Sequence, residues 1–447
     1  MATRNDQDVT DRGESLLDRA TKLLAILRTQ ARRAFVLELT GTPKAGKSTS
    51  VVTLQTFFKE AGFQVHLLKE RAADCPLPMK GHFFFNAWTM ATMLSEVLET
   101  HETNVDLLIL DRGFFDALVW LELQARRDQV TADEKKTFAD FVTLERWRSL
   151  VDVTVIMKVD PVKALEREHQ NQIVHRVGSM MNPQALGEFN DALAQVAREY
   201  EDRFKLIEID TTNAAGVVKT NLDLLEELLP LIEQWADPPI AVLPRQAVVD
   251  VFGERPFLHG DEARAALVQL ASQVSFRKRS DAEKDTDIVQ VIAAGVHAHQ
   301  DRIMVLEREL RDKKSTDYGR RMLWIGCHVD KDGDLLAGAM SCLDRRIQQE
   351  LHLSTHPQTE LLGLAWDRNQ TESQHFGVMF RVPVVSDYVA DHLKNKQFKK
   401  MGRAGRIKSV FMTQEEIVRS LDELDLEPWS AHMARNIKLT QESRNPT

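Results

Sequence analysis

The sequence predicts an α/β protein with two domains, the first built on a parallel β-sheet covered by helices. The chain has 447 residues, which is more than a single hydrophobic core usually accommodates. In the first half, short apolar segments alternate with amphipathic segments of helical period, the pattern of a sheet covered on both faces. A glycine-rich segment follows the first apolar run and precedes a helical pattern, which predicts a loop between a strand and a helix.

The first predicted element is a helix around residues 16–27, whose leucines recur at helical spacing. It serves either internal packing or an interface, so a homo-oligomer stays open. Five apolar segments are expected to form the strands of the sheet: Phe35–Leu39, Val65–Leu68, Leu107–Leu110, Val153–Val159 and Leu206–Ile209. The helices expected between them include Met90–Thr100, Phe114–Gln124, Lys135–Leu150 and Gln184–Tyr200.

The segment after the first strand reads Gly-Thr-Pro-Lys-Ala-Gly-Lys-Ser-Thr, a phosphate-binding loop. Its glycines let backbone N–H groups close on a polyphosphate, the second lysine supplies a cation, and the serine hydroxyl is a ligand for Mg²⁺. The helix that starts there adds the positive end of its dipole. The candidate residues for binding a nucleoside triphosphate are Gly41, Lys44, Ala45, Gly46, Lys47, Ser48 and Thr49.

Charged pairs follow the next two strands, where ligands of open parallel sheets bind. Glu70-Arg71 comes after the second strand and Asp111-Arg112 after the third. Asp111 is expected to hold Mg²⁺ together with Ser48. Arg112 can grip phosphate or substrate through its planar fork, and Glu70 can take a proton from a substrate hydroxyl. The alternative for either pair alone is a solvated loop.

The composition predicts a cytoplasmic globular protein. Hydrophobic residues make up 43% of the chain, and no unbroken apolar segment is long enough to span a bilayer, so no membrane contact is expected. The polar N-terminus does not read as a signal peptide. The three cysteines have neither disulfide nor zinc spacing. A net charge of −9 argues against nonspecific nucleic-acid binding.

Prolines gather at residues 230–256, where helical periodicity stops. This change predicts a domain boundary. The expected divisions are a tail and helix at 1–33, the sheet domain at 34–236, a linker and lead-in at 237–284, a second domain at 285–437 and a tail at 438–447.

Residues 34–228 resemble the thymidylate kinase and deoxynucleoside kinase superfamily. The resemblance is carried by residues 41–49, Lys-Glu-Arg at 69–71, His-Phe-Phe-Phe-Asn-Ala at 82–87, Leu-Asp-Arg-Gly-Phe-Phe-Asp at 110–116 and Val-Asp-Pro-Val-Lys-Ala-Leu-Glu-Arg at 159–167. It implies a P-loop kinase fold that transfers phosphate from ATP, with Mg²⁺, to a nucleoside or nucleoside monophosphate. The catalytic residues it implies are Lys47, Glu70, Asp111, Arg112, Arg167 and Arg176.

Two of these arginines belong to a mobile lid in such kinases. Arg167 and Arg176, with His175 beside them, fall where the family places arginines on the transferring phosphoryl group. Ordinary charge on a helix surface is an equally open interpretation of both arginines.

The acceptor side departs from both branches of the family. Pro43-Lys44 stands where thymidylate kinases often carry Asp-Arg, and Thr89 stands where they carry an arginine. Phe85-Asn86 replaces the Phe-Gln of deoxynucleoside kinases. Gly113 and Asp116 replace residues that are usually aromatic or serine. Trp88, Phe84 and Phe85 stack on a base or fill the core. The candidate substrate residues are Glu70, Arg71, Phe85, Asn86, Trp88 and Arg112.

Residues 285–386 resemble a Nudix domain, which implies a second α+β domain. Ile-Gly-Cys-His-Val at 325–329 resembles the strand before a Nudix box, and residues 343–353 fall on the box helix. Nudix hydrolases gather Mg²⁺ there with glutamates on one helical face. In this chain Arg346 and Gln349 occupy two of those positions and only Glu350 remains. The upstream glycine and glutamate of the box are also missing, because Lys331 and Ala337 occupy those positions.

A retired hydrolase, kept as a binding, scaffold or regulatory module, is the favoured interpretation, because a cation has replaced a metal ligand. The competing one is a hydrolase with rearranged ligands, such as Glu360 or Asp344. Local periodicity makes residues 301–311 a helix, whereas the resemblance makes 302–306 a strand, which we follow. Residues 376–382 alternate as a strand. Trp429 packs internally or stacks on a ligand.

The sequence therefore predicts an ATP-dependent nucleoside or nucleotide kinase joined to a degenerate Nudix-like domain. The alternative is a nucleotide-binding switch or sensor without kinase turnover, serving a stress or antiviral response.

Overall fold

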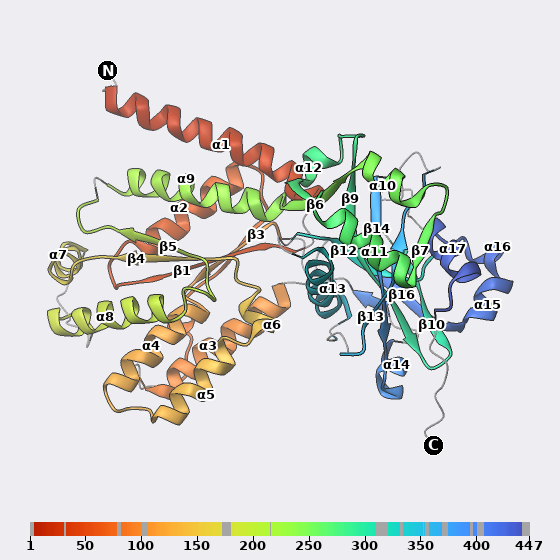
Figure 1. Cartoon of the computed structure of the whole chain (residues 1–447). Coiled ribbons are helices and arrows are strands. Elements are labelled where there is room, and N and C mark those ends of the chain that lie inside the picture. The colour runs from red at the N-terminus through yellow and green to blue at the C-terminus, as the bar shows by residue number, and fades with distance from the viewer. Residues whose placement is uncertain are drawn as a thin grey trace. The chain divides into compact units, whose positions relative to one another are not determined.

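The structure is a computed structural model of the chain (Figure 1). It describes residues 4–30, 33–77, 82–100, 105–171, 180–214, 216–309, 321–330, 334–351, 353, 357–368, 374–393, 397–399 and 406–439. The chain divides into two compact units, residues 1–236 and 237–447, which are described separately.

The first unit is built on a five-stranded parallel sheet with strand order β2-β3-β1-β4-β5. The strands are β1 (Phe35–Gly41), β2 (Val65–Leu68), β3 (Leu107–Asp111), β4 (Val153–Lys158) and β5 (Leu206–Asp210). All seven residues of the central β1 are buried, because helices cover both faces of the sheet. The predicted strands and the α/β class are confirmed, with ends that differ by no more than two residues.

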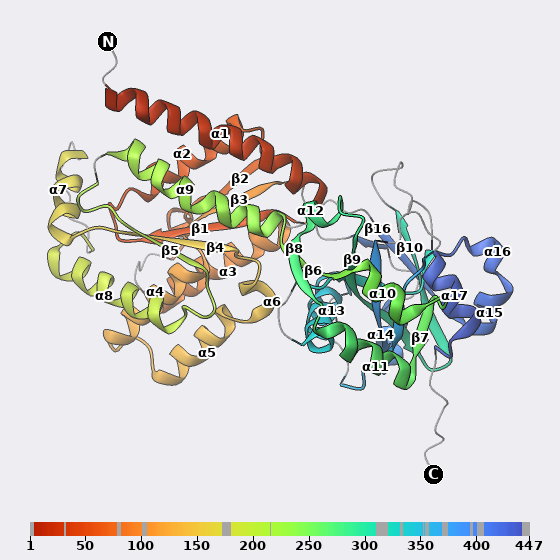
Figure 2. The same ribbon diagram turned by 45° about the horizontal axis from the view of Figure 1, so that its top comes forward.

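Successive residues of β1 contribute to different cores. Leu37 and Leu39 pack in a core with α1 (Arg4–Gln30), α2 (Lys47–Glu60) and α9 (Val217–Ala236). Val36 packs in the opposite core, with α3 (Phe83–Thr100), α4 (Phe114–Arg126), α5 (Ala132–Val142) and part of α8 (Pro183–Glu199). Figure 2 shows α1 and α9 on one side of this sheet and α3, α4 and α5 on the other. The leucine helix at the N-terminus therefore packs within its own unit.

The prediction of a single helix at residues 135–150 was wrong. This segment contains parts of two helices, α5 and the short α6 (Glu145–Arg148). The break occurs because Leu144 takes an extended ψ of 124°, which interrupts the helical hydrogen-bond ladder. The other short elements are η1 (Arg71–Ala73) and α7 (Pro161–Asn171).

The second unit is built on a mixed sheet. Its strands are β6 (Pro239–Pro244), β7 (Phe257–His259), β8 (Ser275–Lys278), β9 (Ile288–His299), β10 (Arg302–Glu309), β11 (Arg321–Met322), β12 (Ile325–His328), β13 (Glu360–Ala365), β14 (His375–Pro383), β15 (Gln397–Lys399) and β16 (Arg406–Thr413). The central β9 pairs in parallel with β14 and antiparallel with β10, β12 and β6. The strands expected at 302–306 and 376–382 are confirmed, and the helix that periodicity favoured at 301–311 is not formed.

Helices cover this sheet as well. One core includes residues of α10 (Arg245–Phe252), α11 (Gly260–Ala271), α13 (Leu335–Leu351) and α14 (Asp387–Leu393). A second core includes residues of α15 (Gln414–Arg419), α16 (Leu421–Leu424) and α17 (Pro428–Asn436), and α12 (Arg279–Ala282) lies beside β8. In the part of the chain that the structure describes, no helix is long and apolar enough to cross a membrane.

The prediction of a linker at residues 237–284 was wrong. These residues form β6, α10, β7, α11, β8 and α12 and belong to the second unit. The prolines misled the prediction because Pro239 and Pro244 lie at the two ends of β6, positions at which a strand tolerates proline. Helix α9 also continues past Pro230 to Ala236.

Candidate functional site

The phosphate-binding loop connects β1 to α2, as the sequence predicts, and its two outer glycines are required by its shape. Gly41 has a φ of +132°, and a Cβ there would lie 1.9 Å from the carbonyl oxygen of Met157 on β4. Gly46 has a φ of +101° and immediately precedes α2. Both backbone angles lie in the left-handed region that favours glycine. The loop therefore leaves β1 against β4 and turns directly into the helix N-terminus.

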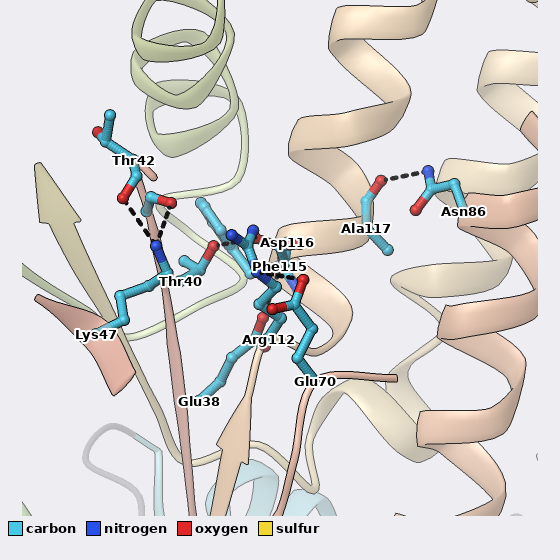
Figure 3. A network of polar contacts seen from close by, with 11 residues as sticks. Glu38, Thr40, Thr42, Lys47, Glu70, Asn86, Arg112, Phe115, Asp116 and Ala117 are labelled. Atoms are coloured by element: carbon cyan, nitrogen blue, oxygen red, sulfur yellow. Dashed lines mark hydrogen bonds and ion pairs between the residues drawn. The ribbon is translucent and has the colours of Figure 1, made fainter. Parts of the chain in front are cut away.

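Lys47 is held inside this loop. Its Nζ donates to the carbonyl oxygens of Gly41 and Thr42, each at 2.8 Å (Figure 3). The residue is buried, and burial, with a further contribution from the charge of Arg112, lowers the pKa of the ammonium group to about 7. Bound phosphates would supply negative charge beside this amine and would stabilise its protonated form. The geometry is therefore suited to an anionic ligand.

Ser48 and Asp111 are the predicted Mg²⁺ ligands. Ser48 is exposed in the first turn of α2, and Asp111 is the last residue of β3, whose strand pairs with β1. Burial raises the pKa of Asp111. A hydroxyl and a carboxylate are oxygen ligands of the kind that Mg²⁺ prefers, so these two residues fit the metal. Thr49 is exposed next to Ser48 on the same helix.

Glu70 and Arg112, predicted from two different strand ends, are in contact. Arg112 has a φ of +66°, and its guanidinium forms ion pairs with Glu70 at 3.0 Å and with Asp116 at 2.8 Å. Although burial opposes it, the charges of Asp116, Glu70 and Asp111 raise the pKa of Arg112. Figure 3 shows the guanidinium near both partners, Glu70 and Asp116. The arginine is thus charged and held in one position.

The structure adds Glu38, which sequence reasoning missed. This glutamate lies inside β1 and is fully buried. Its carboxylate accepts hydrogen bonds from the backbone N–H groups of Phe115 at 3.1 Å and Asp116 at 3.0 Å, at the start of α4. Burial raises its pKa to about 7. A single charged residue in an otherwise apolar strand was the signal that could have found it.

Two further contacts fix α4 to β1. Thr40 Oγ1 donates to Asp116 Oδ1 at 2.6 Å. Gly113 packs so closely on Glu38 that a Cβ there would lie 3.0 Å from the carboxyl carbon. Together with Glu38, these contacts join the strand that leads into the phosphate-binding loop to the helix that carries Asp116. The phosphate-binding loop and the start of α4 are therefore held at a defined spacing.

A cavity of about 340 Å³ opens beside this network. Its polar lining consists of Glu70, Arg71, Asn86, Thr89, Arg112, Asp116, Gln124 and Arg127. Apolar side chains from α3 and α4, among them Phe85 and Trp120, complete it. Asn86 Nδ2 donates to the carbonyl oxygen of Ala117 at 2.9 Å, which ties α3 to α4. The volume and the mainly apolar lining with a few polar groups are typical of a small-molecule site.

The remaining predicted substrate residue, Trp88, is half-buried on α3 and is not among the described residues that line this cavity. Phe85, Asn86, Glu70, Arg71 and Arg112 all line it. The structure thus brings together five of the six predicted substrate residues.

Arg167 lies against the phosphate-binding loop. Its Nη1 donates to the carbonyl oxygen of Lys44 at 3.2 Å and to Thr211 Oγ1 at 3.1 Å. Lys44 forms an ion pair with Glu168 on the same helix, α7. Arg176 and His175 lie outside the described residues. Arg167 therefore contacts the phosphate-binding loop, and its role in a lid stays a prediction.

In the second unit, the segment that resembles a Nudix box helix lies on α13. Arg346 is buried on this helix, and Arg345 forms an ion pair with Asp330 at 2.5 Å. The side chains of Gln349 and Glu350 lie outside the described residues. Among the residues that the structure describes, no group of three or more His, Cys, Asp or Glu side chains is arranged to hold a metal ion.

Trp429 at the start of α17 packs internally. Its ring lies 5.7 Å from that of Trp324, and its backbone N–H donates to Glu427 Oε1 at 3.0 Å. It also lines a cavity of about 220 Å³ with Arg255 and His432. Burial raises the pKa of Glu427, although the carboxylate also accepts hydrogen bonds from Trp324 and Ser430.

The comparisons with known proteins agree with a nucleotide-binding loop in the first unit. Residues 9–81, which include the loop, match the family described as Methylmalonyl Co-A mutase-associated GTPase MeaB. The match is too short to assign the chain to that family. No curated protein matches the chain significantly. Taken with the geometry of the loop, the family match supports a P-loop nucleotide-binding function.

Several solved structures are similar to part of the chain. Deoxyadenosine kinase from M. mycoides with bound dATP is 19% identical, covers 44% of this chain and 99% of its own, and has a TM-score of 0.35. Thymidylate kinase from Candida albicans is 11% identical over 45% of this chain and 92% of its own, with a TM-score of 0.33. Tm1382, a candidate Nudix hydrolase, is 22% identical over 44% of this chain and 96% of its own, with a TM-score of 0.33. None of the three assigns an activity at these similarities.

Proposed function

We propose that the first unit transfers the terminal phosphoryl group of a nucleoside triphosphate, ATP, to a nucleoside or nucleoside monophosphate. The observation that carries the proposal is the cavity lined by Glu70 and Arg112, whose charges also act on the loop lysine Lys47. A protein that only binds or hydrolyses a nucleotide needs no cavity for a second organic molecule. A cavity whose charged residues act on the loop lysine suits transfer between two bound molecules.

The mechanism follows from these positions. The loop amides and Lys47 hold the β- and γ-phosphates of the donor. Ser48 and Asp111 would hold Mg²⁺, which would supply charge neutralisation at the phosphates. Glu70, whose carboxylate is 43% exposed, accepts the proton of the acceptor hydroxyl. The acceptor oxygen then forms a bond to the γ-phosphorus. At the same time the bond between the γ-phosphorus and the β–γ bridging oxygen breaks, and the donor leaves as a nucleoside diphosphate.

Two arginines support this transfer. Arg112, fixed between Glu70 and Asp116, positions the carboxylate of Glu70 for the acceptor hydroxyl. Arg167 is held at the loop by the carbonyl oxygen of Lys44 and by Thr211. Since phosphoryl transfer depends mainly on positioning and charge neutralisation, these side chains supply the required chemistry.

For the second unit we propose a binding or regulatory role. Its α13 carries a buried arginine, Arg346, at a position where the Nudix resemblance implies a carboxylate. A guanidinium repels divalent cations, so this helix is suited to contacts other than metal-assisted hydrolysis.

The test is transfer of label from ATP in the presence of Mg²⁺ to a panel of nucleosides and monophosphates. The parent protein is expected to label an acceptor, and Lys47→Ala and Glu70→Gln are expected to lose most of that turnover. If Lys47→Ala transfers label as fast as the parent, the donor site has been assigned wrongly.

The second candidate function is a nucleotide-dependent switch without transfer. The family match at residues 9–81, to a GTPase, is the observation that favours it. Binding of ATP or GTP without label transfer, together with a nucleotide-dependent change in sedimentation, would support the switch in place of the kinase.

A further inference from the structure

The acceptor cavity has an unusual charge balance, in that each of its arginines is already paired with acids. Arg112 forms ion pairs with Glu70 and Asp116, which themselves line the cavity. Arg71 pairs with Asp74 at 3.2 Å and with Glu96, and Arg127 pairs with Glu188 at 2.8 Å. The three guanidinium groups of the described lining are therefore paired with five carboxylates, of which those of Glu70 and Asp116 line the cavity themselves.

The pair at the centre is also the least accessible to water. The side chain of Asp116 is 7% exposed and that of Arg112 is 16% exposed. Asp116 is further held by the hydroxyl of Thr40 at 2.6 Å. Separating a desolvated ion pair is costly, because each charge would be left without compensation. Arg112 is thus committed to Asp116 and is not available to a second anion at low cost.

A nucleoside and its monophosphate differ by a group that carries about 1.5 to 2 negative charges at pH 7. To enter this cavity, a phosphomonoester must either displace a carboxylate from an arginine or lie beside Glu70 and Asp116 without a partner. An uncharged hydroxyl needs only an acceptor for its proton, and Glu70 supplies one. The cavity's charges therefore favour the neutral acceptor.

We propose that the acceptor is an uncharged nucleoside rather than a nucleoside monophosphate, with Asp116 as the residue that determines this specificity. Asp116 neutralises Arg112 at the cavity wall. This inference rests on the function proposed above for the same site, and it is tested by binding as well as by turnover so that the two can fail separately.

The experiment compares four deoxynucleosides with their 5′-monophosphates, by calorimetry with a non-hydrolysable ATP analogue present and by label transfer from ATP. The parent protein is expected to prefer at least one nucleoside over its monophosphate by roughly tenfold or more, in affinity and in kcat/KM. Asp116→Asn keeps the size of the side chain and its oxygen for Thr40 but removes the charge. It is expected to shift that ratio toward the monophosphate by roughly tenfold.

Two further variants keep the test decisive. Glu188→Gln removes the charge that pairs with Arg127, in an ion pair that is more exposed than that of Arg112 and Asp116. It is expected to shift the preference toward the monophosphate as well, and it remains informative if Asp116→Asn folds poorly. Asp140→Asn removes a carboxylate from an exposed pair with Lys136 on α5 and is expected to leave the ratio unchanged.

Label transfer that favours monophosphates would overturn the inference and leave the proposed kinase function intact. Preferential binding of nucleosides without any transfer would support the inference and contradict the kinase function. If no member of the panel binds, or if neither Asp116→Asn nor Glu188→Gln moves the ratio, the inference is wrong.

Discussion

The two units differ in how they could hold a phosphate-bearing ligand. In the first unit the phosphate-binding loop is made largely of backbone, and the glycines at 41 and 46 have the angles that such a loop requires. In the second unit, the resemblance implies a site made of carboxylates on one helix, α13, and there a buried arginine stands at one of the positions. A site built from amides depends on a few glycines, whereas a site built from side chains is changed by each substitution. The comparison teaches that a site built from backbone amides can be recognised from a few glycines, whereas a site built from side chains can be recognised only where those side chains are present.

Lys47→Ala is expected to have the largest effect of the substitutions considered, because it removes the side chain at the centre of the backbone-built site. Removing the cation that is held at Gly41 and Thr42 should lower label transfer by roughly a hundredfold to a thousandfold, the usual loss when a charge-stabilising group is removed. Turnover measured with saturating ATP checks this. Lys59→Ala, an exposed lysine on the same helix, is the matched control and should keep the parent's rate.

Glu38 tests whether the backbone-built site depends on a buried charge. Its pKa is raised to about 7 from 4.5, so the folded protein binds a proton more tightly than the unfolded chain. Its contribution to the free energy of unfolding is fully present below pH 4.5 and is lost as pH rises to about 7. The loss amounts to about 3 kcal/mol.

Urea unfolding of the parent and of Glu38→Gln at pH 4.5 and pH 8 would reveal this contribution. The variant should lack this part of the pH dependence, because its amide does not titrate. Glu60→Gln, at the exposed end of α2, should behave as the parent does. An unchanged pH dependence in Glu38→Gln would show that the carboxyl does not titrate in this range.

Nucleotide binding should be coupled to proton uptake at Lys47. With a pKa of about 7, this amine is mostly neutral at pH 8 in the free protein. Phosphates would raise its pKa toward the ordinary value, so about one proton should be taken up on binding. Calorimetry in two buffers of different ionisation enthalpy measures the number. Lys47→Arg, which stays charged at this pH, should bind without that uptake.

Whether a feature of this site could be predicted depends on how far apart in the sequence its interacting residues lie. The loop residues and the pairs at 70–71 and 111–112 could be found because a local pattern marks each of them. The contacts of Glu38 and Thr40 with α4 join residues 76 to 78 positions apart, and no local rule predicts such pairing. The three central strands, β3, β1 and β4, were predictable because buried parallel strands are nearly continuous apolar runs. The segment 237–284 was not, because prolines at strand ends have the same signature as prolines in a linker.

The smallest expected effect concerns the second unit. With Lys47→Ala present to silence the first site, the chain should show no hydrolysis of nucleoside diphosphate derivatives above background in Mg²⁺ or Mn²⁺, because Arg346 repels the metals such cleavage needs. Release of phosphate-containing product checks this. Turnover that Glu350→Gln abolishes would restore the hydrolase interpretation and remove the contrast between the units.

The contact between Gly113 and Glu38 restricts how this protein can diverge. A Cβ at position 113 would lie 3.0 Å from the carboxyl carbon of Glu38, so the carboxyl group that anchors α4 would have to shift. We therefore expect the two sites to covary among homologues. Either substitution alone, Gly113→Ala or Glu38→Ala, would disturb one partner, whereas the double variant should be less harmful than their sum. An ancestor could have exchanged this pair for another only by passing through a damaged intermediate or by changing both sites together.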